Sequence, residues 1–185
     1  MNHSFDPSME VSLEEMLAAR ENRVMIQTDL IDRYQMPLVS FTLNIPGPYK
    51  VFGRILEVFE EGCQIIRDVL KQKELPLIYE EILEEKTGYE AFFCVDAEAE
   101  IIKQAMAVPE EETALGRLYD IDIIRKDGTK VSREEIGLPH RSCLLCGRPA
   151  HECSRSRRHT VDELVARIQE MIDNPISGES GTIKT

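Results

Sequence analysis

The chain has 185 residues, of which 34 are acidic and 22 basic, and its formal net charge at pH 7 is −12. This acidic balance argues against sequence-independent nucleic-acid binding, and no apolar run is long enough to span a membrane. The five cysteines lack the spacing of a secreted disulfide framework, and residues 1–15 lack the basic start and apolar segment of a signal peptide. We therefore expect a cytoplasmic protein with one domain over residues 11–174, between disordered tails at 1–10 and 175–185.

The hydrophobic periodicity predicts an α+β fold. In chain order, the apolar patterns and turn residues predict a helix over 12–28, a strand over 38–44, a helix over 49–73, a weaker helix over 78–86, a strand over 90–95, a helix over 96–107, a strand over 119–124, a hairpin turn at 127–128, a short turn at 132–135 and a helix over 160–172. Capping boxes, in which Ser or Thr is followed three residues later by Glu, open the first and the last helix. We expect a single compact domain with a small mixed or antiparallel sheet flanked by helices.

The connection after the first strand is a candidate anion site. Pro48 suits the first position of a helix, and the free N–H groups of a helix start, together with Lys50, are suited to binding a phosphate. The polar residues of the preceding strand, Ser40, Thr42 and Asn44, point toward the same end. A structural Pro/Gly turn with a solvated Lys50 explains the pattern equally well.

The strand over 119–124 carries two carboxylates. Asp120 and Asp122 alternate with apolar residues, so both side chains project from one face, roughly 7 Å apart along the strand. Mg²⁺ or Mn²⁺ takes hard oxygen ligands from one or two carboxylates and from substrate phosphates. This layout suits in-line displacement at phosphorus. A solvated strand face without a metal is the other interpretation.

Cysteines and histidines follow the aspartate strand in a short segment: Cys143, Cys146, Cys153, His140, His151 and His159. Tetrahedral zinc needs four such ligands, and the three cysteines with the nearby His151 are the candidate set. The thiols can equally pack as small apolar side chains. A thioredoxin-like role is disfavoured because the CxxC does not open a helix after a strand.

Basic charge gathers in the same region. Residues 116–159 carry ten basic and six acidic side chains, whereas residues 1–115 carry ten and 23. Guanidinium groups donate paired hydrogen bonds to phosphates. The candidate phosphate-binding arginines are Arg117, Arg141, Arg148, Arg155, Arg157 and Arg158. A solvated basic loop is the alternative.

The strings GRLYDIDII and RSCLLCGRPAHECSRSRRH, with the earlier PLVSFTLNIPGPYK, resemble the citrate lyase holo-[acyl-carrier-protein] synthases, also called apo-citrate lyase phosphoribosyl-dephospho-CoA transferases. The resemblance runs over about residues 13–171. It implies transfer of a prosthetic group from 2′-(5″-triphosphoribosyl)-3′-dephospho-CoA to a serine of the apo acyl-carrier subunit of citrate lyase, with release of diphosphate. This is a nucleotidyltransferase-type step, which divalent metal and arginines would stabilise.

The same resemblance assigns roles to residues. By similarity to the malonate decarboxylase counterpart, the metal role falls on Asp120 and Asp122. A nucleotidyltransferase-like fold is a further implication, although the Gly-Ser turn usual before the carboxylates is missing here. His159 or His140 is a candidate base for the incoming hydroxyl, and a metal-polarised hydroxyl is the alternative.

Two function classes follow from these observations. The first is the transferase. The second is a non-catalytic zinc-binding adaptor, in which the cysteines with a histidine fold a docking surface.

Overall fold

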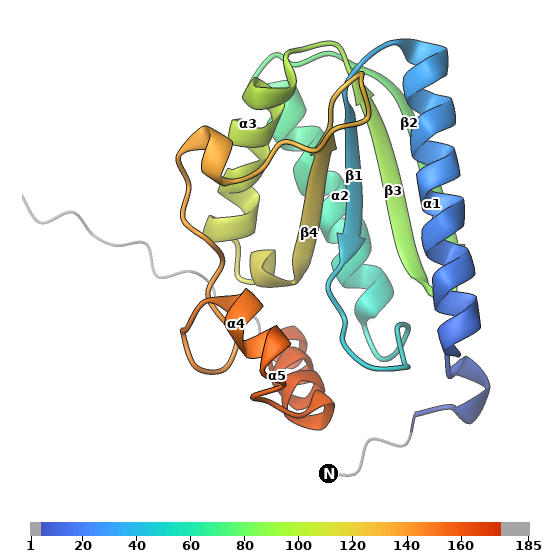
Figure 1. Ribbon diagram of the computed structural model, residues 1–185, viewed down its shortest axis with the longest axis vertical. Coiled ribbons are helices and arrows are strands. Elements are labelled where there is room, and N and C mark those ends of the chain that lie inside the picture. The colour runs from blue at the N-terminus through green and yellow to red at the C-terminus, as the bar shows by residue number, and fades with distance from the viewer. Residues whose placement is uncertain (1–4, 175–185) are drawn as a thin grey trace, which may run out of the picture.

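Four antiparallel strands form one sheet, and helices cover both of its faces (Figure 1). The computed structural model describes residues 5–174. The strands run across the sheet in the order β2-β3-β1-β4. Their bounds are β1 Leu38–Leu43, β2 Leu77–Glu85, β3 Gly88–Val95 and β4 Tyr119–Ile124, and those of the α-helices are α1 Leu13–Tyr34, α2 Ile55–Gln72, α3 Ala99–Glu112, α4 Ala150–Arg155 and α5 Val161–Asp173. The predicted α+β class is confirmed, and the sheet is antiparallel throughout.

The strand register divides the apolar side chains between the two faces of the sheet. Phe41 and Phe93 point to the face that α2 and α3 cover, within the larger core. Leu38 and Phe92 point to the opposite face, where α1 covers them in a smaller core. Helix α1 contacts β1 and β3 and does not cover β4 (Figure 1). One face of β4 is therefore left open beside α1.

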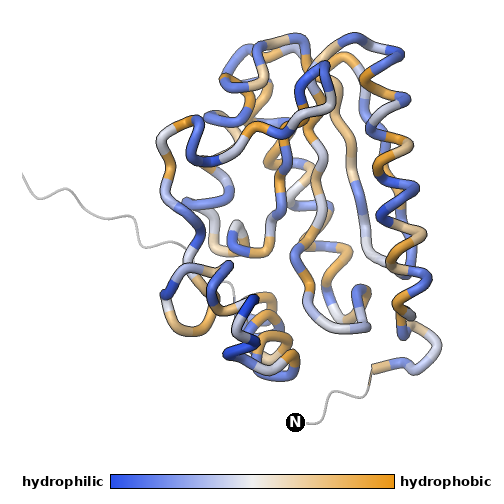
Figure 2. The backbone as a smooth tube through the Cα atoms, in the orientation of Figure 1, coloured by the Kyte–Doolittle hydropathy of each residue, from blue (hydrophilic) through white to orange (hydrophobic). Residues whose placement is uncertain are grey.

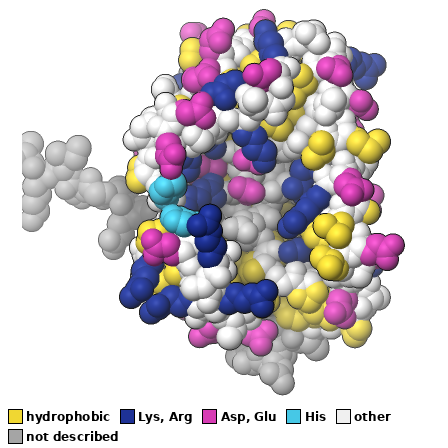
Figure 3. Space-filling view, in the orientation of Figure 1, with side chains coloured by type: hydrophobic (Ala, Val, Ile, Leu, Met, Phe, Trp, Pro, Cys, Tyr) yellow, Lys and Arg dark blue, Asp and Glu magenta, His cyan; other side chains and the backbone are white. Residues whose placement is uncertain are grey.

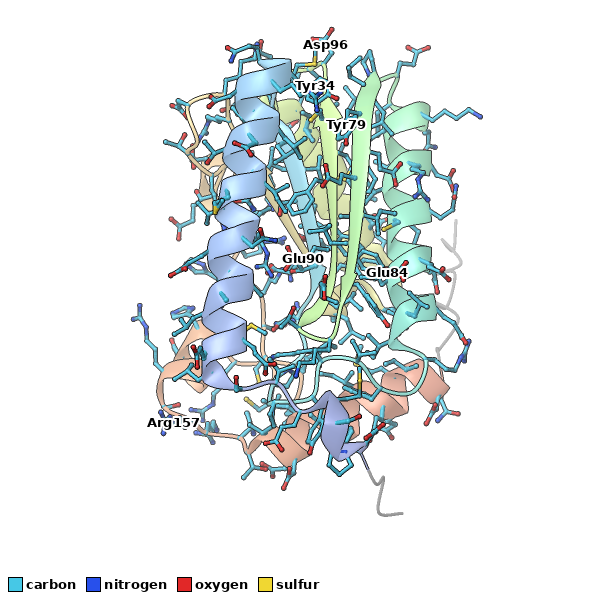
Figure 4. The ribbon with its side chains drawn as sticks, turned by 90° about the vertical axis from the view of Figure 1, so that its right-hand side faces the viewer. Tyr34, Tyr79, Glu84, Glu90, Asp96 and Arg157 are labelled. Carbon is cyan, nitrogen blue, oxygen red and sulfur yellow. The ribbon has the colours of Figure 1, made fainter. Side chains whose placement is uncertain are left out.

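The contacts between α1 and the sheet change from polar to apolar along the helix. At its middle, Arg23 donates two hydrogen bonds, of 2.9 and 2.7 Å, to the carboxylate of Glu90 on β3. Toward its C-terminus, Tyr34 stacks on Tyr79 of β2 at 4.8 Å between ring centroids. Figure 4 shows the two tyrosines together at one end and Glu90 beside the helix farther down. Strand β3 likewise changes from hydrophobic at one end to hydrophilic at the other (Figure 2). The sheet under α1 thus has an apolar end and a polar end.

The predicted helix over 78–86 is wrong, because this segment is the edge strand β2. Ile78 and Ile82 lie four residues apart, a spacing that fits one face of a helix. In the structure the segment is extended, so successive side chains point to opposite faces of the sheet. Tyr79 packs beneath α1, whereas Glu80 accepts a hydrogen bond from Arg67 of α2. Pairing with β3 from Leu77 to Glu85 overrides the local helical pattern.

Helix α2 starts later than the expected residue 49. Gly53 has φ +51°, a left-handed conformation that cannot continue a helix, so α2 begins at Ile55. Lys50 lies in the preceding loop and donates to the carbonyl oxygen of Ile45 at 2.5 Å. The expected phosphate site at a helix start beside Lys50 is therefore not formed in that way.

Both capping boxes are confirmed, at Ser12 with Glu15 and at Thr160 with Glu163. Helices α1 and α3 run about five residues beyond their expected ends, and α4 was not predicted. The Asp127-Gly128 turn forms, but the chain after it pairs with β4 only through one isolated bridge.

Residues 5–10, which we expected in a disordered tail, contain a 3₁₀ turn over Pro7–Met9, and Phe5 stacks on Tyr49 at 4.6 Å. The predicted tails at 1–4 and 175–185 lie outside the described residues. No helix within residues 5–174 has the length and apolar character needed to cross a bilayer.

Gly116, just before β4, is buried against the end of α3. A Cβ at this position would overlap the carbonyl oxygen of Pro109 and lie 2.8 Å from that of Glu110. Both obstacles are backbone atoms, which cannot rotate out of the way as a side chain does.

Gly116→Ala is therefore expected to lower the free energy of unfolding by about 1–3 kcal/mol and to shift β4. Gly137→Ala is the comparison: its Cβ would meet no atom within 4 Å, and only the φ of +76° opposes it. Chemical denaturation of both variants measures the difference. A Gly116→Ala protein as stable as the wild type would contradict the close approach.

Candidate active site

The two aspartates of β4 lie on the open face of the sheet, as the alternating pattern predicted. Tyr119, Ile121 and Ile123 are buried on the opposite face. Thr42 of β1 pairs with Asp120 on one side and with Glu90 of β3 on the other. A row of oxygen-bearing side chains therefore crosses three strands, and α1 covers only its Glu90 end.

The outer edge of β4 is held by side chains instead of another strand. Glu110 of α3 accepts from the backbone N–H of Ile121 at 3.2 Å, and Lys103 of α3 donates to the Ile121 carbonyl oxygen at 2.7 Å. The carboxylate of Glu110 is almost fully buried and also pairs with Arg133 and Arg141. These bonds cap an edge that would otherwise be open to pairing, and they fix Arg141 beside the aspartates.

Asp120 is in an electrostatically unfavourable place for a lone carboxylate. It is open to solvent on one side, but the protein surrounds it on the others. This burial, and then the charge of Asp122, raise the pKa of Asp120, and Arg141 only partly offsets them. Asp122 forms an ion pair with Lys130. A carboxylate pair of this kind is a ready ligand for a divalent cation, because the cation removes the repulsion.

Three adjoining pockets open around the aspartates. The arginine–lysine pocket, about 150 Å³, is lined among others by Arg20, Arg23, Thr42, Asn44, Lys50 and Asp120. The cysteine-side pocket, about 290 Å³, is lined among others by Asn44, Arg117, Arg141, Cys143, Arg157 and His159. The edge pocket, also about 290 Å³, includes Lys103, Glu110, Asp120, Asp122, Arg133 and Arg141. Each pair of pockets has one lining residue in common: Asn44 for the first two, Asp120 for the first and third, and Arg141 for the second and third. The three pockets therefore adjoin one another in one cleft.

The space-filling view shows this cleft as a central hollow (Figure 3). Basic side chains stand on both sides of it, and acidic side chains lie between them. Arginines from α1 and from the segment after β4 thus face each other across the β4 aspartates. This is the charge pattern expected for a site that binds a polyanion together with a metal cation.

The cysteine segment folds into a compact cluster next to the cleft. Cys143 begins a turn in which the N–H of Leu145 donates to the Cys143 sulfur at 3.5 Å, and Gly147 closes the turn at φ +68°. Helix α4 then supplies Cys153. Arg157, at φ +46°, turns the chain back so that His159 reaches the thiols.

Four ligand atoms converge in this cluster, those of Cys143, Cys146, Cys153 and His159, all within 4.8 Å of one another. The Cys146 sulfur lies 3.4 Å from that of Cys153 and 3.3 Å from Nε2 of His159. Ligands of one tetrahedral zinc ion are separated by roughly 3.4–3.8 Å, given Zn–S and Zn–N bonds of about 2.3 and 2.0 Å. The cluster can therefore hold a metal ion such as zinc.

The thiols of the cluster differ in acidity. Burial alone raises the pKa of Cys143, but the N–H groups of Leu145 and Cys146 outweigh it, so the pKa is lower than usual. Burial and the neighbouring thiols raise the pKa of Cys153 to about 11.

The predicted fourth ligand needs correction. His151 lies outside the cluster and packs edge-on against His140, at 5.1 Å between ring centroids. It is exposed on the first turn of α4. His159 is the fourth ligand of the cluster instead. His159, which we considered as a candidate base, therefore lies among the cysteines.

The candidate arginines divide into two groups. Arg117, Arg141 and Arg157 line the cysteine-side pocket. Arg117 donates to the carbonyl oxygen of Ser142, next to Cys143. Arg148, Arg155 and Arg158 are exposed and line none of the three pockets. Arg157 lies at the end of α4 (Figure 4).

Sequence reasoning missed the residues that other elements bring to the cleft. Arg20 and Arg23 come from α1, and Glu110 comes from α3. One signal was available: Arg20, Arg23 and Gln27 are spaced three and four apart, which places them on one helix face. Gln27 indeed donates to Ser40 of β1 at 2.9 Å. Glu110 gave no comparable signal, since α3 was expected to end before it.

Comparison with known proteins identifies relatives along nearly the whole chain. The family model described as apo-citrate lyase phosphoribosyl-dephospho-CoA transferase matches residues 11–175. A probable apo-citrate lyase phosphoribosyl-dephospho-CoA transferase of Vibrio cholerae is 42% identical over 169 residues, which cover 91% of this chain and 95% of that protein. An apo-citrate lyase phosphoribosyl-dephospho-CoA transferase of Citrobacter koseri is 34% identical over 162 residues, 88% of each chain. A probable one of Streptococcus pyogenes is 32% identical over 166 residues, 88% of this chain and 85% of that one.

Proposed function

The chain belongs to the apo-citrate lyase phosphoribosyl-dephospho-CoA transferase family, and we propose that it performs the transfer for which that family is named. The donor is 2′-(5″-triphosphoribosyl)-3′-dephospho-CoA and the acceptor is a serine of the apo acyl-carrier subunit of citrate lyase. The serine oxygen forms a bond to the phosphorus nearest the ribose. The bond from that phosphorus to the leaving diphosphate breaks, and the hydroxyl proton passes to solvent water.

The observation that carries this proposal is the aspartate pair at the floor of a cleft with cationic walls. Asp120 and Asp122 offer hard anionic ligands where arginines from two sides converge. The donor set fits Mg²⁺ or Mn²⁺, because both groups are hard oxygen ligands. Burial, and then the charge of Asp122, raise the pKa of Asp120, and a bound cation would offset both effects. When bound there, the cation would neutralise charge on the reacting phosphates.

The protein groups have separate tasks in this mechanism. Asp120 and Asp122 would hold the cation at the strand. Arg141, which the buried Glu110 fixes in place, faces the same space and stabilises negative charge on the phosphates. Lys130 pairs with Asp122, and a cation bound at Asp122 would compete with that ion pair. We assign no general base, because the ring of His159 belongs to the cysteine cluster.

We further propose that the cluster of Cys143, Cys146, Cys153 and His159 binds zinc in a structural role. Arg141 lies two residues before Cys143, and the Ser142 carbonyl between them holds Arg117. A closed four-ligand site would therefore fix the wall of the cleft that carries these two arginines. All four coordination positions are filled by protein, which is the pattern of structural rather than catalytic zinc.

The adaptor alternative is less well supported. It explains the cysteine cluster but not the carboxylates, the buried Glu110 network or the cleft between them. The relatives named above are transferases.

The transfer is tested by measuring diphosphate release with and without the apo carrier subunit. The proposal predicts release that depends on both the donor and the carrier and that stops when the divalent cation is chelated. Release at the same rate without the carrier would indicate hydrolysis, and no release at all would favour the adaptor.

Two neighbouring arginines provide a matched pair for the cysteine-side pocket. Arg157→Gln is expected to raise the apparent KM for the donor by about tenfold at low salt, because charge-assisted hydrogen bonds to phosphate are lost. Arg155→Gln, two residues earlier and outside the pocket, should change KM by less than about twofold. Steady-state kinetics across a range of salt concentrations compare them. Equal effects would mean that only the overall charge of the segment matters.

A further inference from the structure

The arginine–lysine pocket is the smallest of the three pockets of the cleft, and two of its cations, Arg20 and Lys50, have no ion-pair partner among residues 5–174. Arg20, Arg23 and Lys50 line it, and within the described residues its acidic lining consists of Glu90 and Asp120. Arg23 and Glu90 neutralise each other through their two-pronged ion pair. Two positive charges therefore remain against Asp120, which would itself be neutralised by a bound cation.

Arg20 and Lys50 lie close enough to repel each other. Lys50 is half-buried, and its pKa is lowered by burial first and then by the charge of Arg20. Its one hydrogen bond goes to a neutral acceptor, the carbonyl oxygen of Ile45. Among residues 5–174, Arg20 forms no hydrogen bond or ion pair with a side chain or carbonyl. Cations held together in this way are stabilised when an anion binds between them.

The pocket also has neutral polar side chains and a defined place in the cleft. Thr42 and Asn44 line it together with the basic residues and Asp120. Its volume of about 150 Å³ is half that of each neighbouring pocket. It therefore suits a compact, highly charged group better than an adenine ring or a pantetheine chain.

We propose that the arginine–lysine pocket binds the diphosphate that leaves in the reaction, with Arg20 and Lys50 as its principal ligands. This assignment rests on the proposed function, since the diphosphate is the terminal part of the donor's triphosphate. The pocket adjoins Asp120, so a diphosphate there would extend away from the reacting phosphorus toward α1. The edge and cysteine-side pockets are left for the rest of the donor and for the carrier.

Binding of inorganic diphosphate, measured by calorimetry at constant ionic strength with Mg²⁺ present, tests the proposal without requiring turnover. Wild-type protein should bind, and Arg20→Gln should bind roughly tenfold more weakly. Arg20→Lys, which keeps the charge, should retain most of the affinity. The control is Arg33→Gln, on the same helix but over the ring of Tyr34, outside the pocket. It should bind as the wild type does.

Kinetics separate this proposal from the transferase function. Arg20→Gln should raise KM for the donor and leave KM for the carrier unchanged. If wild-type protein transfers the group but Arg20→Gln binds diphosphate normally, or if Arg33→Gln weakens binding equally, the pocket assignment is wrong. If diphosphate binds and depends on Arg20 but no transfer occurs, the pocket stands and the proposed function fails. Absence of diphosphate binding to the wild type also overturns the assignment.

Discussion

Replacing Asp120 with Asn is expected to reduce the rate of transfer by several hundredfold or more while the protein stays folded. The substitution removes one anionic ligand with little change of shape, and metal stabilisation of a reacting phosphate contributes roughly 3–4 kcal/mol. Asp122→Asn should have an effect of similar size. Single-turnover rates at saturating donor measure the chemical step. Asp68→Asn, on α2 with only a hydrogen bond from Gln64, is the control and should transfer normally.

The raised pKa of Asp120 adds a prediction about stability with a definite sign. A carboxyl group whose pKa is higher in the folded state binds protons more tightly when folded, so stability falls as the pH rises from its unfolded pKa through its folded pKa. At neutral pH the ionised Asp120 therefore destabilises the metal-free protein. Asp120→Asn should melt at the same temperature as the wild type or higher, although it is inactive.

The same reasoning links Asp120 to the metal. Mg²⁺ should raise the melting temperature of the wild type and not that of Asp120→Asn, and this stabilisation should weaken as the pH falls through the pKa of Asp120. Thermal melts with and without Mg²⁺ over a pH series measure it. Equal stabilisation of both proteins would place the cation elsewhere.

Removal of zinc is expected to have the second large effect, on stability rather than on chemistry. Cys146→Ser, or a strong chelator, should lower the free energy of unfolding by on the order of a few kcal/mol, because metal binding contributes to folding of the segment that it closes. As zinc is removed, the protein should lose stability before each remaining folded molecule loses turnover. Zinc content together with denaturation curves provides both readouts.

The two nearby histidines give the zinc prediction a matched control. His159→Ala should lose bound zinc or hold it much more weakly, whereas His151→Ala should keep one zinc per chain. If His151→Ala lost zinc and His159→Ala kept it, the ligand set predicted from the sequence, with His151 as the fourth ligand, would be correct. A wild-type protein purified without zinc, and unable to take it up, would reject the site.

Local patterns predicted the parts of the fold that local interactions determine. The capping boxes at Ser12 and Thr160 satisfy free N–H groups within one turn, and the alternation around Asp120 follows from strand geometry alone. The segment 78–86 was misassigned because its pairing with β3, which local sequence does not reveal, decides its structure. The start of α2 was missed because a left-handed Gly53 cannot be distinguished from an ordinary helical glycine in the sequence.

The candidate site shows the same division. The aspartates lie close together in the sequence, as do the CxxC cysteines, so both could be recognised as candidate metal ligands from the sequence. The second side of the cleft comes from α1, about a hundred residues earlier, and nothing in the spacing of Arg20 and Arg23 indicates which strand they face. The choice between His151 and His159 depends on how α4 turns the chain at Arg157, which is a three-dimensional property.

The most direct test of the central claim is the intact mass of the apo carrier subunit after incubation with the donor, comparing wild-type protein with Asp120→Asn. The mechanism predicts that wild-type protein with Mg²⁺ adds one prosthetic group to one serine and releases one diphosphate for each carrier modified. Asp120→Asn should leave the carrier unmodified over the same period. A carrier left unmodified by wild-type protein would contradict the transfer, and equal modification by both proteins would contradict the role of the aspartate strand.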